Sequence, residues 1–145
     1  MKLNWLNEKL CKPKLRTYNV FKQIWGTEKY LSFSLTPFER STIAKLRLGI
    51  LPLAVETGRY NNIPLEDRIC ALCDLNEVET EYHFVFVCTR YNELRENLLN
   101  MAHFDRNWFL SLNLTDKFNF LFEKPKLFSQ YLLKCLELRQ SVLYT

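Results

Sequence analysis

Three cysteines and one histidine in the middle of the chain are spaced as metal ligands. Cys70, Cys73, His83 and Cys88 follow the pattern C-x2-C-x9-H-x4-C. Thiolates and neutral imidazole bind Zn²⁺ in a closed tetrahedron, and two cysteines separated by two residues can reach one ion through a tight turn. The spacing therefore predicts one zinc ion per chain, held by four protein ligands in a structural role.

The spacing of the second ligand pair restricts the local structure. His83 and Cys88 are five residues apart, a rotation of about 140° along a continuous α-helix, so they cannot share one face of such a helix. We expect a short zinc-knuckle turn between helices, with His83 on a short helix or turn, Cys88 just past its end and Thr89 opening the next helix. The alternative is that these side chains simply pack in a core, where free cysteines are often buried.

No second chemical site is predicted outside this cluster. Cys11 and Cys135 lie in apolar helical contexts and are expected to pack, whereas His103 is expected to cap a helix or face solvent. The sequence lacks the phosphate-binding P-loop, nucleophile-elbow and zinc-protease motifs, so no catalytic residue and no enzyme activity are predicted. The carboxylates near the metal ligands are interpreted as a solvated face: Glu66, Asp67, Asp74, Glu77, Glu79 and Glu81.

Length and composition predict one mainly α domain. The 145 residues include only 3 Gly and 5 Pro but 11 Phe, 7 Tyr and 3 Trp, and 48% of them are hydrophobic. A chain of this size can bury a substantial core, and so few glycines disfavour a β-sandwich or a low-complexity chain. We expect a compact helical domain over 1–145, made of a basic helical part (1–60), the zinc segment with its following helix (61–105) and C-terminal helices (106–145).

No targeting or membrane-spanning segment is predicted. No apolar run reaches the length that a membrane span needs, and the first ten residues do not form a signal peptide. The chain should therefore stay in a reducing compartment, where its five cysteines are better metal ligands than disulfide partners. We expect an intracellular protein, nuclear or cytoplasmic, that is neither secreted nor bound to a membrane.

Hydrophobic periodicity predicts helices on both sides of the zinc segment. Residues 53–69 show no helical period and are expected to form an extended connector. Thr36 and Pro37 read as an N-cap and a first helical residue. Before the zinc segment, helices are expected from about residue 14 to Gly26, over 27–34, and from Pro37 to Pro52 with Ile43, Leu46 and Ile50 inward. After the cysteines, one helix is expected from Thr89 with Tyr91, Leu94, Leu98 and Met101 inward, and another after Thr115 with Phe118, Leu121 and Phe122 inward. A last helix is expected over 125–142, with Phe128, Tyr131, Leu132, Cys135 and Leu136 inward.

Charge is distributed unevenly along the chain. Residues 1–60 hold 11 basic and 4 acidic side chains, whereas residues 61–105 hold 3 and 9. Basic side chains that neutralise phosphates drive sequence-independent binding to RNA or DNA, so the first segment is the candidate interface. An ordinary solvated surface is the alternative for each of its candidate residues, which are Lys12, Lys14, Arg16, Lys22, Arg40, Lys45, Arg47 and Arg59.

Two of these candidates are placed to act together. Arg40 and Arg47 are seven residues apart, which brings them to nearly the same face of the expected helix. They could reach one phosphate together. Equally, one of them could pair with Glu56 or another carboxylate and stabilise the fold.

Two stretches, residues 40–60 and 68–95, carry a family resemblance. They read RSTIAKLRLGILPLAVETGRY and RICALCDLNEVETEYHFVFVCTRYNELR, and together they resemble the zinc-binding segment that follows the reverse transcriptase domain in non-LTR retrotransposon proteins of animals. With KLRTYNVFK upstream and DKFNFLF downstream, the likeness spans roughly residues 14 to 139. The matching positions before the ligands are Arg40, Lys45, Leu46, Arg47, Gly49, Pro52, Glu56, Gly58, Arg59 and Tyr60, and Thr89 departs from the Pro of many relatives.

The resemblance implies an accessory module that helps a reverse transcriptase hold RNA or DNA, or a host protein derived from such an element. Its four metal ligands match Cys70, Cys73, His83 and Cys88. The competing function class is a zinc-stabilised helical module that docks to a polymerase or to another protein. The sequence leaves open RNA against DNA, base specificity, the oligomeric state and whether the chain is a remnant without function.

Overall fold

The computed structural model describes residue 5, residues 16–22 and residues 26–144 of the chain. The described part is mainly helical, as the composition predicts, and its only β pairing is an isolated antiparallel bridge between Ile69 and Val78. Its elements are α2 (Arg16–Phe21), η2 (Lys29–Ser32), α3 (Pro37–Leu48), α4 (Ala54–Tyr60), η3 (Leu65–Asp67), the π-helical turn η4 (His83–Val87), η5 (Thr89–Tyr91), α5 (Asn92–Met101), α6 (Arg106–Ser111), α7 (Leu114–Phe122) and α8 (Pro125–Leu143).

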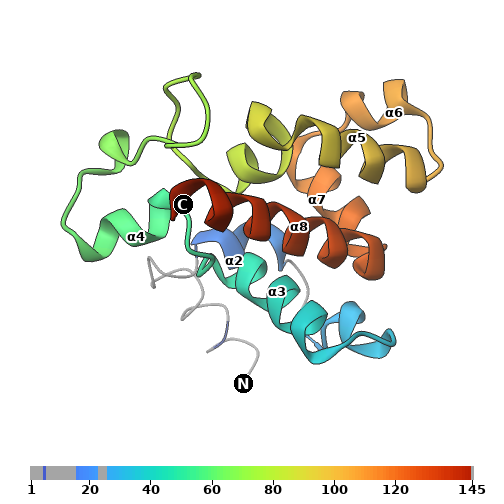
Figure 1. Cartoon of the computed structure of the whole chain (residues 1–145). Coiled ribbons are helices and arrows are strands. Elements are labelled where there is room, and N and C mark those ends of the chain that lie inside the picture. Colours follow the sequence, from blue (N-terminus) through green and yellow to red (C-terminus); the bar gives the residue numbers. More distant parts are fainter. Residues whose placement is uncertain (1–4, 6–15, 23–25, 145) are drawn as a thin grey trace.

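The long C-terminal helix α8 forms the centre of the fold. It lies between α3 on one side and α5 on the other, and α7 also packs against it (Figure 1). Its period of 3.6 residues turns one apolar stripe inward. Phe128, Leu132 and Cys135 are completely buried in that stripe, as the periodicity predicts. The helix therefore connects the basic first part of the chain to the part that follows the metal ligands.

Helix α3 begins where the sequence predicts. The Thr36 side chain accepts a hydrogen bond from the Glu39 amide, and the Glu39 carboxylate accepts one from the Thr36 amide, which makes a capping box. Lys126 of α8 also donates to Glu39 at 2.7 Å, and this bond holds the pKa of the carboxyl near 2. The cap therefore also fastens the start of α3 to the start of α8.

The end of α3 differs from the prediction. The helix stops at Leu48, because Gly49 adopts the left-handed conformation with φ of 69°, and it does not run on to Pro52. Ile43 and Leu46 are fully buried as expected, but Ile50 lies beyond the helix and is 46% exposed.

The prediction of an extended connector over 53–69 is wrong at its start, where α4 forms. This helix has only seven residues, too few for a visible period. A carboxylate of Glu79, 25 positions further along the chain, accepts a hydrogen bond from the Ala54 amide at its first turn. Glycine is suited to position 58 because it has no Cβ, and a Cβ there would meet the Arg68 side chain at 2.6 Å. Tertiary contacts, and not local sequence, select this helix.

Smaller differences concern helix ends and one further helix. Thr89 begins the single turn η5 and its side chain caps nothing, so α5 starts three residues later, at Asn92. Met101 is exposed, and α7 is capped by Asn113 in place of Thr115. Helix α6 was not expected, and it is capped by Asp105. Of the helix predicted from residue 14, the segment Arg16–Phe21 is described and helical, while residues 23–25 lie outside the described part.

No helix among the described residues is both long enough and apolar enough to cross a membrane.

Candidate metal centre

The first ligand pair sits on a turn that follows the isolated bridge. The Cys70 amide donates to the Glu77 carbonyl at 2.9 Å, which closes the loop that carries Cys73. Within the turn, the Leu72 amide points back at the Cys70 sulfur at 3.5 Å. Backbone amides directed at sulfur favour the thiolate form that a metal needs. This segment thus folds locally as a turn that directs Cys70 and Cys73 to the same point.

The second ligand pair is brought together by a π-helical turn. The Cys88 amide donates to the carbonyl of His83, five residues earlier, at 2.8 Å. An i→i+5 turn is wider than an α-helical turn, so residues five apart come to nearly the same side. His83 and Cys88 can therefore reach the same point, which they could not do on a continuous α-helix. Cys88 lies just past the end of the turn, as predicted. The Thr80 hydroxyl accepts a hydrogen bond from the His83 amide at 3.1 Å and fixes the start of the turn.

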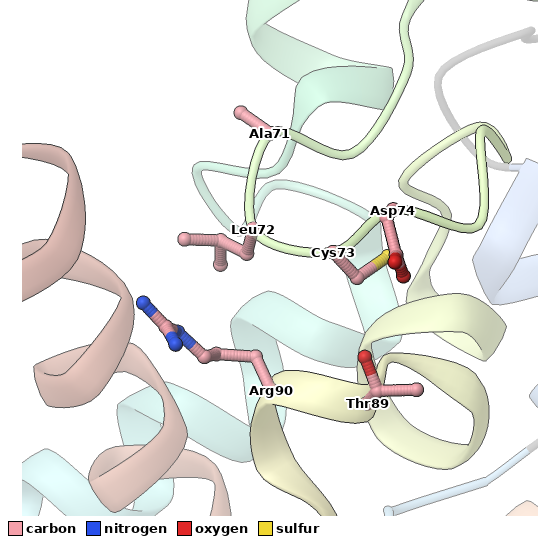
Figure 2. Close-up of a pocket in the computed structure, with 6 residues that line it drawn as sticks. All are labelled: Ala71, Leu72, Cys73, Asp74, Thr89 and Arg90. Carbon is pink, nitrogen blue, oxygen red and sulfur yellow. The ribbon is translucent and has the colours of Figure 1, made fainter.

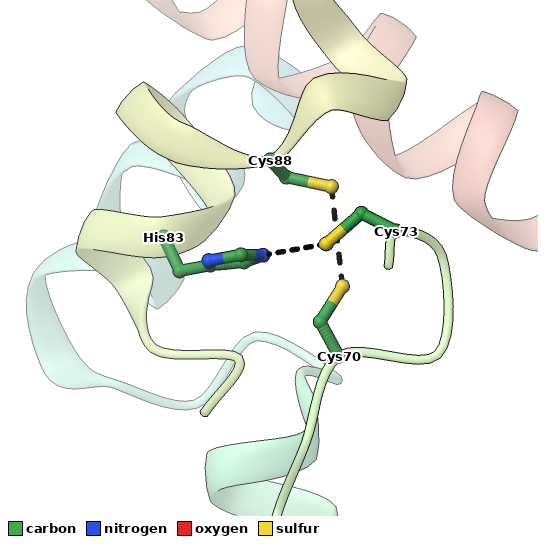
Figure 3. Close-up of side chains that lie close together, drawn as sticks. All are labelled: Cys70, Cys73, His83 and Cys88. Carbon is green, nitrogen blue, oxygen red and sulfur yellow. Dashed lines mark hydrogen bonds between the residues drawn. The ribbon is translucent and has the colours of Figure 1, made fainter. Parts of the chain in front are cut away.

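All four predicted ligand residues converge on one point (Figure 3). Their ligand atoms lie within 4.8 Å of one another. The Cys70 and Cys88 sulfurs are 3.9 Å apart, and the Cys73 sulfur is 3.4 Å from Nε2 of His83. Cys70, His83 and Cys88 are buried, and Cys73 is half-buried. Four such donors at these separations can bind one metal ion.

A carboxylate outside the cluster orients the histidine ring. Oε2 of Glu77 lies 3.1 Å from Nδ1 of His83, on the side of the ring away from the cysteines. A partner at Nδ1 selects the tautomer whose free nitrogen is Nε2, and this arrangement is common for histidines that bind metals. The ring therefore presents Nε2 to the sulfurs.

Burial disfavours thiolates in this cluster unless a cation is present. Desolvation raises the pKa of Cys70 to about 12, and it raises the pKa of Cys88 as well. A bound divalent cation reverses this preference, because it stabilises coordinated thiolates directly. Burial therefore favours the thiol form of Cys70 and Cys88 without a metal, and coordination would favour their thiolate form.

The half-buried ligand faces an open depression (Figure 2). Its volume is about 460 Å³. Ala71, Leu72 and Asp74 of the turn line it together with Cys73, and Thr89 and Arg90 line the opposite side. The depression gives a metal ion access to the cluster from solvent.

Cysteines and histidines outside the cluster behave as predicted where the structure describes them. Cys135 is completely buried in the core, and burial raises the pKa of its thiol to about 12, so it is a packing residue. His103 is exposed at the end of α5, in the left-handed region with φ of 49°. Cys11 lies outside the described residues.

The acidic residues near the cluster do not all form a solvated face. Glu66, Asp67, Asp74 and Glu77 are exposed, as predicted. Glu79 and Glu81 are not, with 1% and 7% of their surface exposed. Glu79 forms an ion pair with Arg139 of α8 at 2.8 Å. The sequence does not reveal the role of Glu79, because its partner lies 60 positions away.

The basic candidates separate into internal and exposed side chains. Lys22 and Arg47 are buried, and both form ion pairs with Glu28, at 3.2 and 3.0 Å. The Arg47 guanidinium also lies over the Phe122 ring at 4.7 Å. Arg47 is thus a fold-stabilising residue, and it does not face solvent together with Arg40.

The remaining basic candidates are distributed as follows. Arg59 pairs with Glu56 at 2.7 Å and is partly exposed. Arg40 and Lys45 are exposed on α3, and no described carboxylate forms an ion pair with either. Arg16 begins α2, although its side chain is not described, and Lys12 and Lys14 lie outside the described residues.

Comparison of the chain with known protein families, with curated proteins and with solved structures finds no match.

Proposed function

We propose that Cys70, Cys73, His83 and Cys88 bind one structural Zn²⁺. Around a tetrahedral zinc with ordinary bond lengths, two sulfurs lie about 3.8 Å apart, and a sulfur and a nitrogen lie about 3.6 Å apart. The separations of 3.9 Å and 3.4 Å in this structure support this ion. Soft sulfur donors also favour zinc over the hard cations Mg²⁺ and Ca²⁺, which prefer oxygen.

The proposed zinc is structural because four protein ligands complete its coordination. A catalytic zinc keeps one position for water or substrate, and this cluster offers four donors from the protein itself. Three of the four ligand residues are also buried. We therefore propose a binding module without enzyme activity, in which the metal fastens the 70–73 turn to the π-helical turn.

We further propose that this module binds RNA or DNA through its phosphates, as an accessory part related to retrotransposon reverse transcriptases. The observation that carries this proposal is the pair of exposed cations on α3, Arg40 and Lys45. The exposed carboxylates of the zinc segment would repel a phosphate backbone, so the contact is placed on the basic helices. Lys22 and Arg47 are left out of the proposed interface, because both side chains are buried.

Replacement of both exposed cations on α3 tests the nucleic-acid interface. We expect Arg40→Gln/Lys45→Gln to weaken binding to a labelled single-stranded RNA and to a labelled DNA duplex. Each lost phosphate contact should flatten the slope of log K against log salt by roughly 0.7–0.9. Fluorescence anisotropy at several salt concentrations measures both quantities on the zinc-loaded protein.

The matched control changes two exposed carboxylates that lie outside the cluster. Glu66→Gln/Asp67→Asn should keep or slightly raise the affinity, because these groups only repel phosphate. If the carboxylate pair loses affinity while the Arg40/Lys45 variant retains it, the interface is assigned to the wrong surface.

One observation favours a second candidate function, docking to a protein. A groove between α3 and α8, with a volume of about 390 Å³, is lined by apolar and polar side chains, with Lys45 and Arg139 among the polar ones. Phe38 and Tyr144 line it while each remaining 78% exposed. Such exposed aromatics are typical of protein interfaces. Binding to a polymerase that is lost in Phe38→Ala but insensitive to salt would favour this function over nucleic-acid binding.

A further inference from the structure

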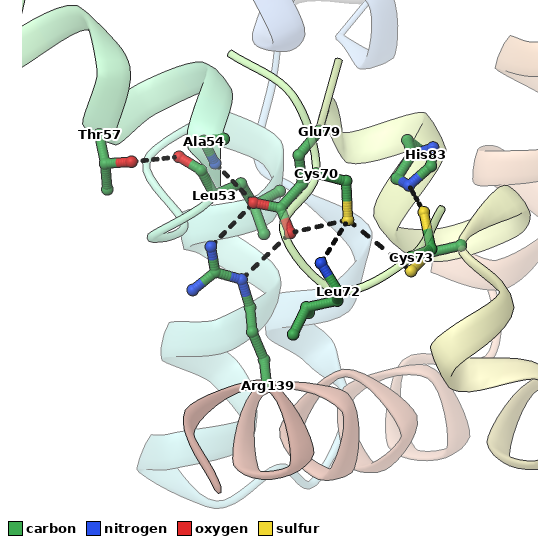
Figure 4. A network of polar contacts seen from close by, with 10 residues as sticks. Leu53, Ala54, Thr57, Cys70, Leu72, Cys73, Glu79, His83 and Arg139 are labelled. Atoms are coloured by element: carbon green, nitrogen blue, oxygen red, sulfur yellow. Dashed lines mark hydrogen bonds and ion pairs between the residues drawn. The ribbon is translucent and has the colours of Figure 1, made fainter. Parts of the chain in front are cut away.

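A buried ion pair lies directly behind the metal ligands. The carboxylate of Glu79 accepts two hydrogen bonds from Arg139, at 3.1 and 2.8 Å, and a third from the Ala54 amide at 2.6 Å (Figure 4). Its Oε2 atom is also 3.8 Å from the sulfur of Cys70. Glu79 is 1% exposed, and 12% of the Arg139 side chain is exposed. One carboxylate thus joins α4, α8 and a metal ligand.

The Glu79 carboxylate would be repelled by the ligand cluster once zinc is bound. Zn²⁺ with three thiolates and a neutral imidazole carries one net negative charge. A buried carboxylate next to one of the thiolates adds a second, and like charges in a medium of low dielectric repel strongly. The Arg139 guanidinium is the cation that contacts the carboxylate, and it does so at the oxygen that faces Cys70 as well as at the other.

We infer that Arg139 is a positioning residue of the metal centre, which neutralises Glu79 so that this carboxylate can stand beside a thiolate ligand. The inference rests on the proposed zinc site. Arg139 belongs to the central helix, 51 residues after the last ligand, Cys88. Metal binding and the docking of α8 are therefore coupled through one ion pair, and loss of the guanidinium should weaken metal binding even where the ligands are intact.

Loss of the Arg139 charge and loss of the Glu79 charge should affect the cluster differently. Without Arg139, the carboxylate is left buried, unpaired and next to an anionic cluster. With Glu79→Gln, the amide oxygen still accepts from Ala54, and the negative charge is gone. Arg139→Gln should therefore be much more harmful to metal binding than Glu79→Gln, and the double variant should recover most of the loss.

The test measures zinc affinity by competition with a chromogenic chelator, and Co²⁺ replaces zinc for a spectroscopic readout. We expect Arg139→Gln to lower zinc affinity about 10–100-fold, which is typical when a partner of a metal ligand is lost. Glu79→Gln and Glu79→Gln/Arg139→Gln should stay close to wild type. The Co²⁺ spectrum of Arg139→Gln should show a changed sulfur-to-metal charge-transfer band.

Arg47→Gln is the matched control, because Arg47 is also a buried arginine in an ion pair but contacts Glu28 and Phe122, away from the ligands. It should reduce thermal stability while leaving zinc affinity and the Co²⁺ spectrum unchanged. The inference is overturned if Arg139→Gln binds zinc as tightly as wild type, or if Glu79→Gln loses as much affinity as Arg139→Gln. A wild-type chain that binds neither zinc nor Co²⁺ would instead overturn the zinc site itself.

Discussion

Cys73→Ser is expected to abolish stoichiometric zinc binding and to remove fixed structure from residues 66–92. The 70–73 turn and the π-helical turn meet at the ligand cluster, where the four ligand atoms lie within 4.8 Å of one another. Leu72 of the first turn and Phe84 and Val85 of the second also belong to the same buried hydrophobic cluster. Structural zinc contributes about 10–16 kcal/mol of apparent binding energy in small zinc-finger peptides, so loss of the metal should release the two turns from each other. Chelation should have the same effect. Hydrogen exchange and near-UV circular dichroism, together with metal analysis, measure the result.

Cys135→Ser is the control for this substitution. It makes the same chemical change at a cysteine that is completely buried but belongs to the core and not to the ligand set. It should lower stability by about 1–3 kcal/mol, the cost of an unsatisfied buried hydroxyl, and still bind one zinc. The prediction is wrong if Cys73→Ser retains one zinc per chain and unchanged protection from exchange, or if Cys135→Ser loses the metal.

Phe84→Ala is expected to cost about 3–5 kcal/mol of unfolding free energy, the range for removal of a fully buried phenylalanine. Phe84 follows the ligand His83, is completely buried and meets the Tyr91 ring edge-to-face at 5.2 Å. Its removal therefore leaves a cavity between the metal site and the core. Urea denaturation of the zinc-loaded protein measures the loss.

Phe38→Ala removes the same side chain from an exposed position. Because Phe38 is 78% exposed, the unfolding free energy of the Phe38→Ala protein should differ from that of the wild type by less than about 0.5 kcal/mol. Equal losses in the two variants would mean that the π-helical turn is not packed into the core as described.

The ligand set could be found from sequence because its signal is local. Two cysteines two residues apart and a histidine and a cysteine further along are visible in one short stretch, and chemistry gives few other reasons for that combination. The start of α3 was equally accessible, since the Thr36–Pro37 pair and the Glu at position 39 form a capping box within four residues. The apolar period of α8 extends over nineteen residues, enough to be clear.

The rest depends on residues that are distant in the chain. Helix α4 was missed because its first amide is satisfied by Glu79 and not by a local cap. The role of Glu79 was missed for the same reason, since charge alone suggests a solvated surface while its partner, Arg139, is supplied by the fold. For Arg47, pairing with a carboxylate was one of the two alternatives, and the fold selects it by supplying Glu28 as the partner. The π-helical turn has no sequence signature beyond the five-residue spacing, which an α-helix could not have satisfied.

X-ray absorption spectroscopy of the purified chain, with zinc quantified in the same sample, tests whether these four residues hold a structural zinc. One zinc per chain, with three sulfurs at about 2.3 Å and one nitrogen at about 2.0–2.1 Å, is the result that a closed site of Cys70, Cys73, His83 and Cys88 requires. A shell with two or fewer sulfurs, an added water oxygen, or a metal-free chain whose residues 66–92 keep their fixed structure would contradict a structural zinc at this cluster.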